Sequence, residues 1–218
     1  MFYSIINLYS NSFKTIVYDF PGHGKSDRLD RFETDFWFYN AQVANALLEE
    51  LKLNKVDVIG TSGGALVGIN LALENPEKVK TLMADSFEGE SPLASYVSTI
   101  KEDRENAKQD SNVQAFWRSC HGEDWRSVVD NDTKVNIEFA ETYTSFFHKS
   151  ISELKVPTLI TGSMEDEFCS HLDKIYEELR SKNPELKVYI FEKGNHPAML
   201  SNRDEFFELT RKFINEHK

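Results

Sequence analysis

Hydrophobic and polar residues follow two alternating periods along most of this chain. Short runs rich in β-branched residues alternate with longer segments that place apolar residues at helical spacing. The runs that predict strands are 14–19, 55–59, 79–84, 156–161 and 186–191, and the segments that predict helices are 2–9, 35–53, 63–74, 171–181 and 203–217. Strands separated by helices indicate parallel pairing, so we expect an α/β fold, a mostly parallel sheet with helices on both faces.

Residues 88–153 interrupt this alternation. They contain few strand signals and carry 7 basic against 13 acidic residues. Aromatic side chains supply apolar surface among these charges: Trp117, Trp125, Phe139, Tyr143, Phe146 and Phe147. We therefore predict a helical lid at 88–153, inserted into a core formed by 1–87 and 154–218.

Charge and cysteine content exclude several classes of protein. A net charge of −11 argues against nucleic-acid binding, which requires clustered cations. No apolar stretch reaches the roughly 20 residues of a membrane span, and the first residues do not resemble a signal peptide. Cys120 and Cys169 make no disulfide framework and have no metal-ligand spacing, which predicts a cytoplasmic protein without a metal.

The strongest local signal is the pentapeptide at 60–64, Gly-Thr-Ser-Gly-Gly. It fits G-x-S-x-G and lies between a predicted strand and a predicted helix, the context that this motif requires. We expect Gly60 and Gly64 to remove side chains that would collide at the sharp turn. Ser62 would then project as a nucleophile at the amino end of the helix, and the Gly63 N–H would donate to a developing oxyanion.

A serine nucleophile needs a base, and His196 has the most suitable position. It lies in the loop between the last predicted strand and the last predicted helix, where open α/β sheets collect ligands. Four other histidines are expected to be surface or packing residues, His23, His121, His148 and His217, and His171 opens a predicted helix instead of lying in that loop.

The third member, an acid, is not fixed by spacing. The strand at 156–161 runs into a loop with three consecutive carboxylates, Glu165, Asp166 and Glu167. Asp166 is preferred because it precedes an apolar-leaning segment that leads into a helix. Glu165 is its close rival, and Asp85, after an earlier strand, is a third candidate.

Four ordered motifs together resemble the α/β-hydrolase fold superfamily. They are Asp-Phe-Pro-Gly-His-Gly-Lys-Ser-Asp-Arg at 19–28, the pentapeptide at 60–64, Val-Pro-Thr-Leu-Ile at 156–160 with its acidic loop, and Gly-Asn-His-Pro at 194–197. The resemblance implies Ser62 as nucleophile, His196 as base and Asp166 as acid. In the family the acid usually stands three residues after the glycine, which here is Glu165, so the choice between the two stays open.

The chain also departs from the family pattern. Members normally have strands before the turn at 19–28, a strand between those at 14–19 and 55–59 in the sheet, and a His-Gly loop that donates the second oxyanion N–H. Either this chain is a truncated, incomplete form or its sheet closes differently. Loss of one such donor costs about 2.7–4 kcal/mol of transition-state stabilisation in a serine protease. We therefore expect the chain as given to be a weak or inactive hydrolase, with an exposed strand edge that could pair in a homodimer.

The residues favour hydrolysis of a carboxylic ester or a related acyl compound, a small molecule, without a cofactor. The aromatic lid suggests a small to medium, partly apolar substrate, and the negative field disfavours a strongly anionic one. The same three residues also serve thioesters, amides, peptides and carbon–carbon bonds, and the resemblance does not choose among them. The alternative from another class is a non-catalytic, hydrolase-like binding protein.

Overall fold

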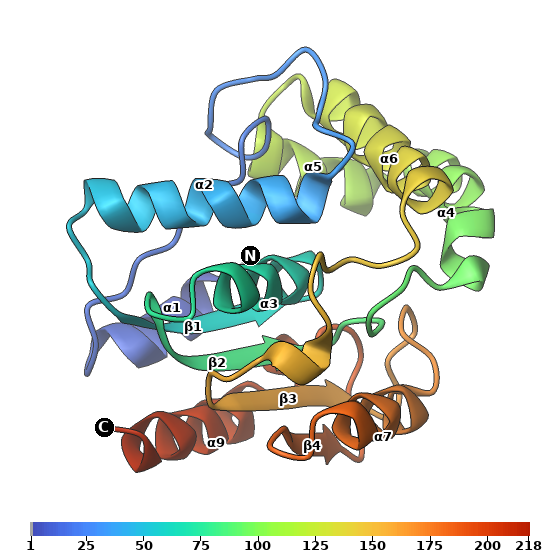
Figure 1. The fold of residues 1–218 in the computed structure, drawn as a ribbon. Helices are drawn as coiled ribbons and strands as arrows, with labels where there is room; N and C mark the ends of the chain where they lie inside the picture. Colours follow the sequence, from blue (N-terminus) through green and yellow to red (C-terminus); the bar gives the residue numbers. More distant parts are fainter. Residues whose placement is uncertain (1) are drawn as a thin grey trace. The chain divides into compact units, whose positions relative to one another are not determined.

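The computed structural model describes residues 2–218, and strands alternate with helices through most of that range (Figure 1). The strands are β1 (Val56–Thr61), β2 (Val79–Asp85), β3 (Thr158–Ser163) and β4 (Lys187–Phe191). The helices are α1 (Tyr3–Ser10), α2 (Phe36–Glu50), α3 (Gly63–Glu74), α4 (Ala94–Ala107), α5 (Ser111–His121), α6 (Trp125–Thr142), α7 (Leu172–Lys182), α8 (Ala198–Ser201) and α9 (Arg203–Glu216), with a 3₁₀ turn at Ile151–Glu153.

The four strands of the described chain form one parallel sheet in the order β1-β2-β3-β4. β2 and β3 are central and almost wholly buried, whereas β4 at one edge alternates between exposed and half-buried positions. Because all four strands run in the same direction, the loops that follow them gather at one edge of the sheet. The predicted α/β class is confirmed.

Helices cover both faces of the sheet, and neighbouring residues of β2 show which helix covers which face. A Cβ atom added at Gly68 of α3 would lie 3.0 Å from Leu82, so α3 packs on the face to which Leu82 points. Met83, the next residue, clusters instead with Phe213 and Ile214 of α9. Side chains alternate along a strand, so α3 and α9 lie on opposite faces.

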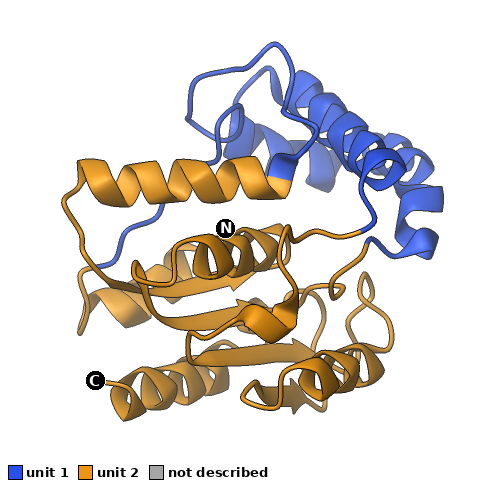
Figure 2. Ribbon diagram, viewed as in Figure 1, with its two compact units in different colours: residues 1, 15–36, 92–144 blue, residues 2–14, 37–91, 145–218 orange. Residues whose placement is uncertain are grey.

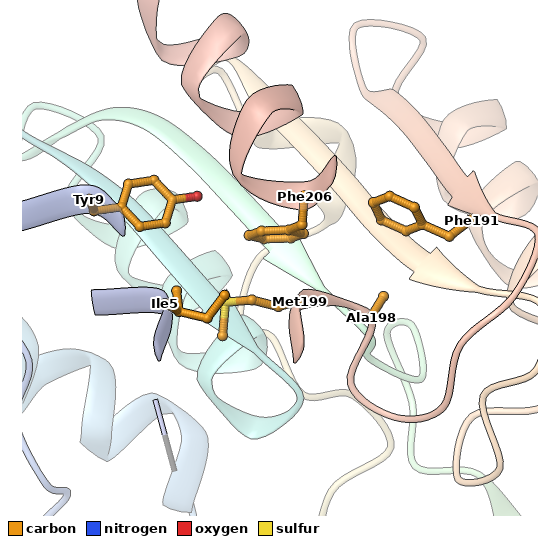
Figure 3. Close-up of a cluster of buried hydrophobic side chains, with 6 residues drawn as sticks. All are labelled: Ile5, Tyr9, Phe191, Ala198, Met199 and Phe206. Carbon is orange, nitrogen blue, oxygen red and sulfur yellow. The ribbon is translucent and has the colours of Figure 1, made fainter. Parts of the chain in front are cut away.

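The amphipathic helix predicted at 2–9 is present as α1, and it packs in the core beside α9. Figure 3 shows one cluster of buried side chains that α1 forms with the end of β4, with α8 and with α9: Ile5, Tyr9, Phe191, Ala198, Met199 and Phe206. The Tyr9 hydroxyl is also hydrogen-bonded to the hydroxyl of Thr210 on α9. This cluster fixes the start of α8 and so supports the loop that carries His196.

The strand predicted at 14–19 is wrong. Residues 14–20 have no strand conformation, and Ile16 and Val17 are 39% and 58% exposed. A strand needs a hydrogen-bonded neighbour, and within residues 2–218 the sheet contains no strand that pairs with this segment. The β-branched residues therefore have strand propensity without a partner.

The chain divides into two compact units (Figure 2). One unit combines 15–36 with 92–144, and the other contains the sheet within 2–14, 37–91 and 145–218. In the first unit the Arg28 guanidinium joins the 22–26 turn to the α5–α6 junction, because it donates to the carbonyls of Gly24 and His121 and pairs with Asp124. The grouping of 15–36 with α4–α6 was not indicated by the sequence, and the lid boundaries at 88 and 153 stay a prediction.

No helix within residues 2–218 combines the length and the apolar character that crossing a membrane requires.

Candidate active site

The backbone turns sharply at Ser62, which alone separates β1 from α3. Its φ of 52° and ψ of −126° lie in a region that L-residues rarely adopt, at a cost of about 1–3 kcal/mol. The turn brings the backbone of the next helix very close to the strand: a Cβ atom at Gly60 would lie 2.1 Å from the Gly64 carbonyl oxygen. Glycine at position 60 is therefore a steric requirement of this turn.

The expectation for Gly64 is wrong in its detail. A Cβ atom built at Gly64 meets nothing within 4 Å, so a side chain there would not collide. The crowded glycine is its neighbour Gly63, where a Cβ atom would lie 2.5 Å from the Trp37 ring. The close approach at Gly60 involves the backbone of Gly64, which any residue type would supply.

The amide groups around Ser62 are arranged as the start of a helix requires. The Ser62 N–H donates to the Asp85 carbonyl at 2.8 Å, which continues the pairing of β1 with β2 by one residue. Gly63 is the first residue of α3, and within residues 2–218 its N–H has no acceptor. An unpaired N–H at a helix amino end is suited to bind an oxyanion, the part predicted for Gly63.

His196 lies in the loop between β4 and α8, and its imidazole contacts Asp166. The distance from Nδ1 of His196 to Oδ2 of Asp166 is 2.8 Å, and the two side chains are 13% and 0% exposed. The other carboxylate oxygen of Asp166 accepts the N–H groups of Phe168 and Cys169 at 3.0 and 2.8 Å. Burial raises the pKa of Asp166, but the hydrogen bonds from His196, Cys169 and Phe168 outweigh it, so that the net pKa is lowered.

All three consecutive carboxylates of the acidic loop hold the loop of His196, each at a different point. Glu165 accepts the Gly194 N–H at 3.1 Å, Asp166 binds the imidazole, and Glu167 accepts the His196 N–H at 2.8 Å. Among the three, Asp166 is the one in contact with the ring, so the geometry favours Asp166 over Glu165 as the acid. The sequence did not indicate that Glu165 and Glu167 hold the same loop, although adjacent carboxylates after a strand were the available signal.

Asp85, the third candidate acid, has a different set of partners. Its side chain is fully buried and accepts the Thr61 and Thr161 hydroxyls at 2.8 and 2.7 Å and the Met199 N–H at 3.0 Å. Burial raises its pKa to about 6, and these three hydrogen bonds limit the rise. Within the described residues its carboxylate makes no hydrogen bond to the imidazole, which disfavours Asp85 as the acid.

Two further residues beside His196 were not singled out by sequence. The Phe168 ring stands edge-on to the imidazole, with centroids 5.2 Å apart, and its side chain is 57% exposed. The buried Cys169 offers its Sγ, and this atom, one Asp166 oxygen and one His196 nitrogen all lie within 4.8 Å of one another. That donor set is of the type that binds zinc, but the carboxylate and the ring are already bonded to each other. Burial and the nearby carboxylates raise the pKa of the Cys169 thiol.

The predicted nucleophile and base follow the first and last strands at the same edge of the sheet. Within residues 2–218, Ser62 Oγ makes no hydrogen bond to His196, and the Nε2 atom of His196 has no partner. In ligand-free enzymes such catalytic hydrogen bonds are often long and tighten when substrate binds. The arrangement thus supplies a strained serine, an unpaired helix N–H, and an imidazole with a buried carboxylate on one side and a free nitrogen on the other.

These features define the class of the protein. The family model described as alpha/beta hydrolase fold matches residues 1–112, half of the chain, and the chain belongs to this family. Its curated relatives include the 2-hydroxy-6-oxo-6-phenylhexa-2,4-dienoate hydrolase of Burkholderia cepacia, 26% identical over 93% of this chain and 77% of the relative. A 2-hydroxy-6-oxononadienedioate/2-hydroxy-6-oxononatrienedioate hydrolase of Comamonas testosteroni is 24% identical over the same shares.

Solved structures support the fold. NosK from Streptomyces actuosus matches with a TM-score of 0.77 at 19% identity, over 99% of this chain and 91% of that one. A serine hydrolase from Cycloclasticus zankles matches with a TM-score of 0.79 at 16% identity, over 98% and 83%. At these identities the likeness concerns the arrangement of helices and strands.

Proposed function

We propose that this chain is a serine hydrolase that cleaves a carboxylic ester or a related acyl compound with Ser62, His196 and Asp166. The observation that carries the proposal is the 2.8 Å contact between the His196 imidazole and the buried Asp166 carboxylate. A histidine whose Nδ1 is held by a carboxylate has its other nitrogen available as a general base. The strained backbone of Ser62 after β1 supports the assignment of the nucleophile.

Acylation and deacylation each need two proton transfers through His196, and neither step needs a cofactor. Nε2 of His196 takes the Ser62 proton as Oγ attacks the substrate carbonyl, and the Gly63 N–H donates to the oxyanion that forms. The imidazolium, stabilised by Asp166, then gives that proton to the leaving alcohol, which leaves an acyl group on Ser62. The same imidazole takes a proton from a water molecule as the water oxygen attacks the acyl carbonyl. It then returns that proton to Ser62 Oγ as the carboxylic acid leaves, which restores the free serine.

The exposed Phe168 ring beside His196 favours a substrate with an apolar part. The net charge of −11 disfavours a strongly anionic substrate. The names of the relatives support a second candidate, a 2-hydroxy-6-oxo-dienoate compound attacked at its oxo carbon. The two candidates use the same serine and base and differ in the group that leaves.

A fluorophosphonate probe tests the proposal without knowledge of the substrate. We expect covalent labelling of the wild-type chain, complete loss in Ser62→Ala, and full labelling in the control Ser119→Ala, which alters an exposed serine of α5. Labelling of a serine other than Ser62 would contradict Ser62 as the nucleophile. No labelling of the folded wild type would contradict a serine hydrolase and favour a binding protein.

Two substrates then separate the ester from the oxo-dienoate. If the substrate is an ester, we expect the chain to release p-nitrophenol from p-nitrophenyl acetate and p-nitrophenyl butyrate, and we expect Ser62→Ala to abolish this release. If the substrate is a 2-hydroxy-6-oxo-dienoate, we expect the absorbance of this conjugated compound to decrease as it is cleaved, and we expect esters to be cleaved more slowly. The ratio of the two kcat/KM values decides between them.

A further inference from the structure

A row of three hydrogen-bonded side chains crosses the sheet at its carboxyl edge. Asp85 is the register partner of Thr61 on one side and of Thr161 on the other, so these residues stand side by side on β1, β2 and β3. Both threonine hydroxyls donate to the Asp85 carboxylate, at 2.8 and 2.7 Å. The row ends one residue before Ser62 along β1.

The same residue reaches both halves of the proposed catalytic machinery. The Asp85 carbonyl accepts the Ser62 N–H at 2.8 Å, and its carboxylate accepts the Met199 N–H, three residues after His196. Ser86 adds a second contact to the latter segment, because its hydroxyl accepts the Ala198 N–H at 2.8 Å. Asp85 and Ser86 thus join the Ser62 turn directly to the start of α8.

A carboxylate is the side chain that this position requires. All three partners of the Asp85 side chain donate, and an ionised carboxylate accepts without donating. Its charge is buried and within the described residues no cationic side chain pairs with it, an arrangement that costs folding free energy. Apolar residues would fill the space at a lower cost, but they would leave the Met199 N–H of the His196 segment unbonded.

We propose that Asp85 is a positioning residue that fixes the distance between Ser62 and His196. The proposal rests on the hydrolase function proposed above, and it assigns to Asp85 neither contact with substrate nor the part of the acid. Loss of the carboxylate frees the start of α8, so His196 moves relative to Ser62. Substrate binding would remain, and the acylation step would slow.

The chain offers a matched control on the same two strands. Asp57 of β1 accepts the hydroxyl of its register partner Thr81 of β2 at 2.7 Å. This pair repeats the chemistry of Asp85 and Thr61 nearer the amino ends of the strands, away from Ser62 and His196. Asp57→Ala therefore removes a cross-strand Asp–Thr bond without altering either catalytic loop.

The experiment compares Asp85→Ala, Asp85→Asn and Asp57→Ala with the wild type. The readouts are the rate of Ser62 labelling by a fluorophosphonate and kcat and KM for a p-nitrophenyl ester. We expect Asp85→Ala to slow labelling and kcat by about 10²-fold with KM unchanged, the scale for a misplacement of about 1 Å. Asp85→Asn should restore much of this loss, because its oxygen can accept from Thr61 and Met199 while its amide donates to the Thr161 hydroxyl. Asp57→Ala should label at the wild-type rate.

Hydrogen exchange provides a readout that does not depend on catalysis. The Ala198 and Met199 amides should exchange faster in Asp85→Ala than in the wild type, and Asp57→Ala should not change them. An unlabelled wild type would contradict the hydrolase function, and unchanged exchange at Ala198 and Met199 would separately contradict the positioning role. Equal labelling of wild type and Asp85→Ala, or equal losses in the Asp85 and Asp57 variants, would also overturn it. If Asp85→Ala does not fold, the same comparisons are made with Asp85→Leu, which fills the space of the carboxylate and likewise leaves the Met199 N–H without its acceptor.

Discussion

The two compact units each contain a histidine paired with an aspartate, and the pairs differ in what else they touch. In the sheet-containing unit, His196 and Asp166 are 2.8 Å apart and the imidazole keeps its Nε2 free of any partner within residues 2–218. In the other unit, His23 and Asp132 are 3.4 Å apart. Nδ1 of His23 lies 3.2 Å from the Pro21 carbonyl, so both ring nitrogens of this histidine are engaged.

The carboxylates of the two pairs, Asp132 and Asp166, also differ in their other partners. Asp132 is bound by the Arg104 guanidinium at 3.2 Å as well as by His23, whereas Asp166 is bound by His196 and two backbone N–H groups and, within residues 2–218, by no arginine or lysine. The His23 ring is also stacked on Phe32 with centroids 4.7 Å apart. A histidine–aspartate pair therefore suits proton transfer when one ring nitrogen stays open and the carboxylate charge is not already matched by an arginine.

The largest expected difference between the two pairs concerns the histidines. His196→Gln should reduce ester hydrolysis by about 10⁶-fold, the scale found when the base of a serine protease is removed. His23→Gln should leave the rate unchanged because His23 has no free ring nitrogen and lies in the other unit. The measurement is kcat for a p-nitrophenyl ester. A comparable fall in kcat in both variants would contradict the proposed difference between the two histidine–aspartate pairs.

The aspartates should differ next. Asp166→Asn should lower kcat by about 10⁴-fold because the amide no longer fixes the imidazole tautomer. Asp132→Asn should not change kcat. The fluorophosphonate labelling rate measures the same contrast without a chosen substrate. If Glu165→Gln instead produced the large loss, Glu165 would be the acid and the assignment of Asp166 would be wrong.

Asp85 is a fully buried carboxylate to which, among the described residues, neither a histidine nor an arginine is bonded, and the stability of the protein should therefore depend on pH through this group. Its pKa of about 6 in the folded chain exceeds the ordinary value of 3.8. As the pH falls, the folded state therefore binds a proton at a higher pH than the unfolded state does. The free energy of unfolding should therefore fall as pH rises from 4 through 6, by about 3 kcal/mol.

The Asp85→Asn variant should lack this contribution, because its amide does not titrate. Urea unfolding of both chains at a series of pH values between 4 and 8 measures the difference. If the free energy of unfolding changed with pH in the same way for both chains, Asp85 would not carry the buried charge inferred from its contacts.

The smallest effect should be on stability in the helical unit. Asp132→Asn removes a partner of Arg104 and His23 in a site where the aspartate side chain is 20% exposed, and should cost about 2 kcal/mol in the free energy of unfolding. Glu138→Gln, also on α6 but 40% exposed and paired with the exposed Lys134, is the control and should change stability by less than about 0.5 kcal/mol. Urea denaturation at neutral pH measures both, and equal changes would contradict a structural part for Asp132.

Local sequence determined the features whose geometry depends on near neighbours. The turn at Ser62 is one of them, since Gly60 and the start of α3 lie within a few residues of it. The alternation of apolar runs likewise predicted β1 to β4 and the helices between them, because period and propensity are properties of short segments. The parallel sheet also accounts for the shared location of the loops that carry Ser62, Asp166 and His196, because the loops after parallel strands gather at one edge.

Only the tertiary structure decided which groups meet. Glu165, Asp166 and Glu167 are adjacent and chemically alike, and the fold of their loop against Gly194–His196 directs one of them to the imidazole. Residues 14–19 have strand propensity but no strand neighbour in the described part of the chain, 2–218, because pairing partners come from distant segments. Asp85 acquires its partners in the same way, because the register of three strands and the position of α8 set them. Contacts between distant segments depend on the whole packing, and a local pattern does not contain that information.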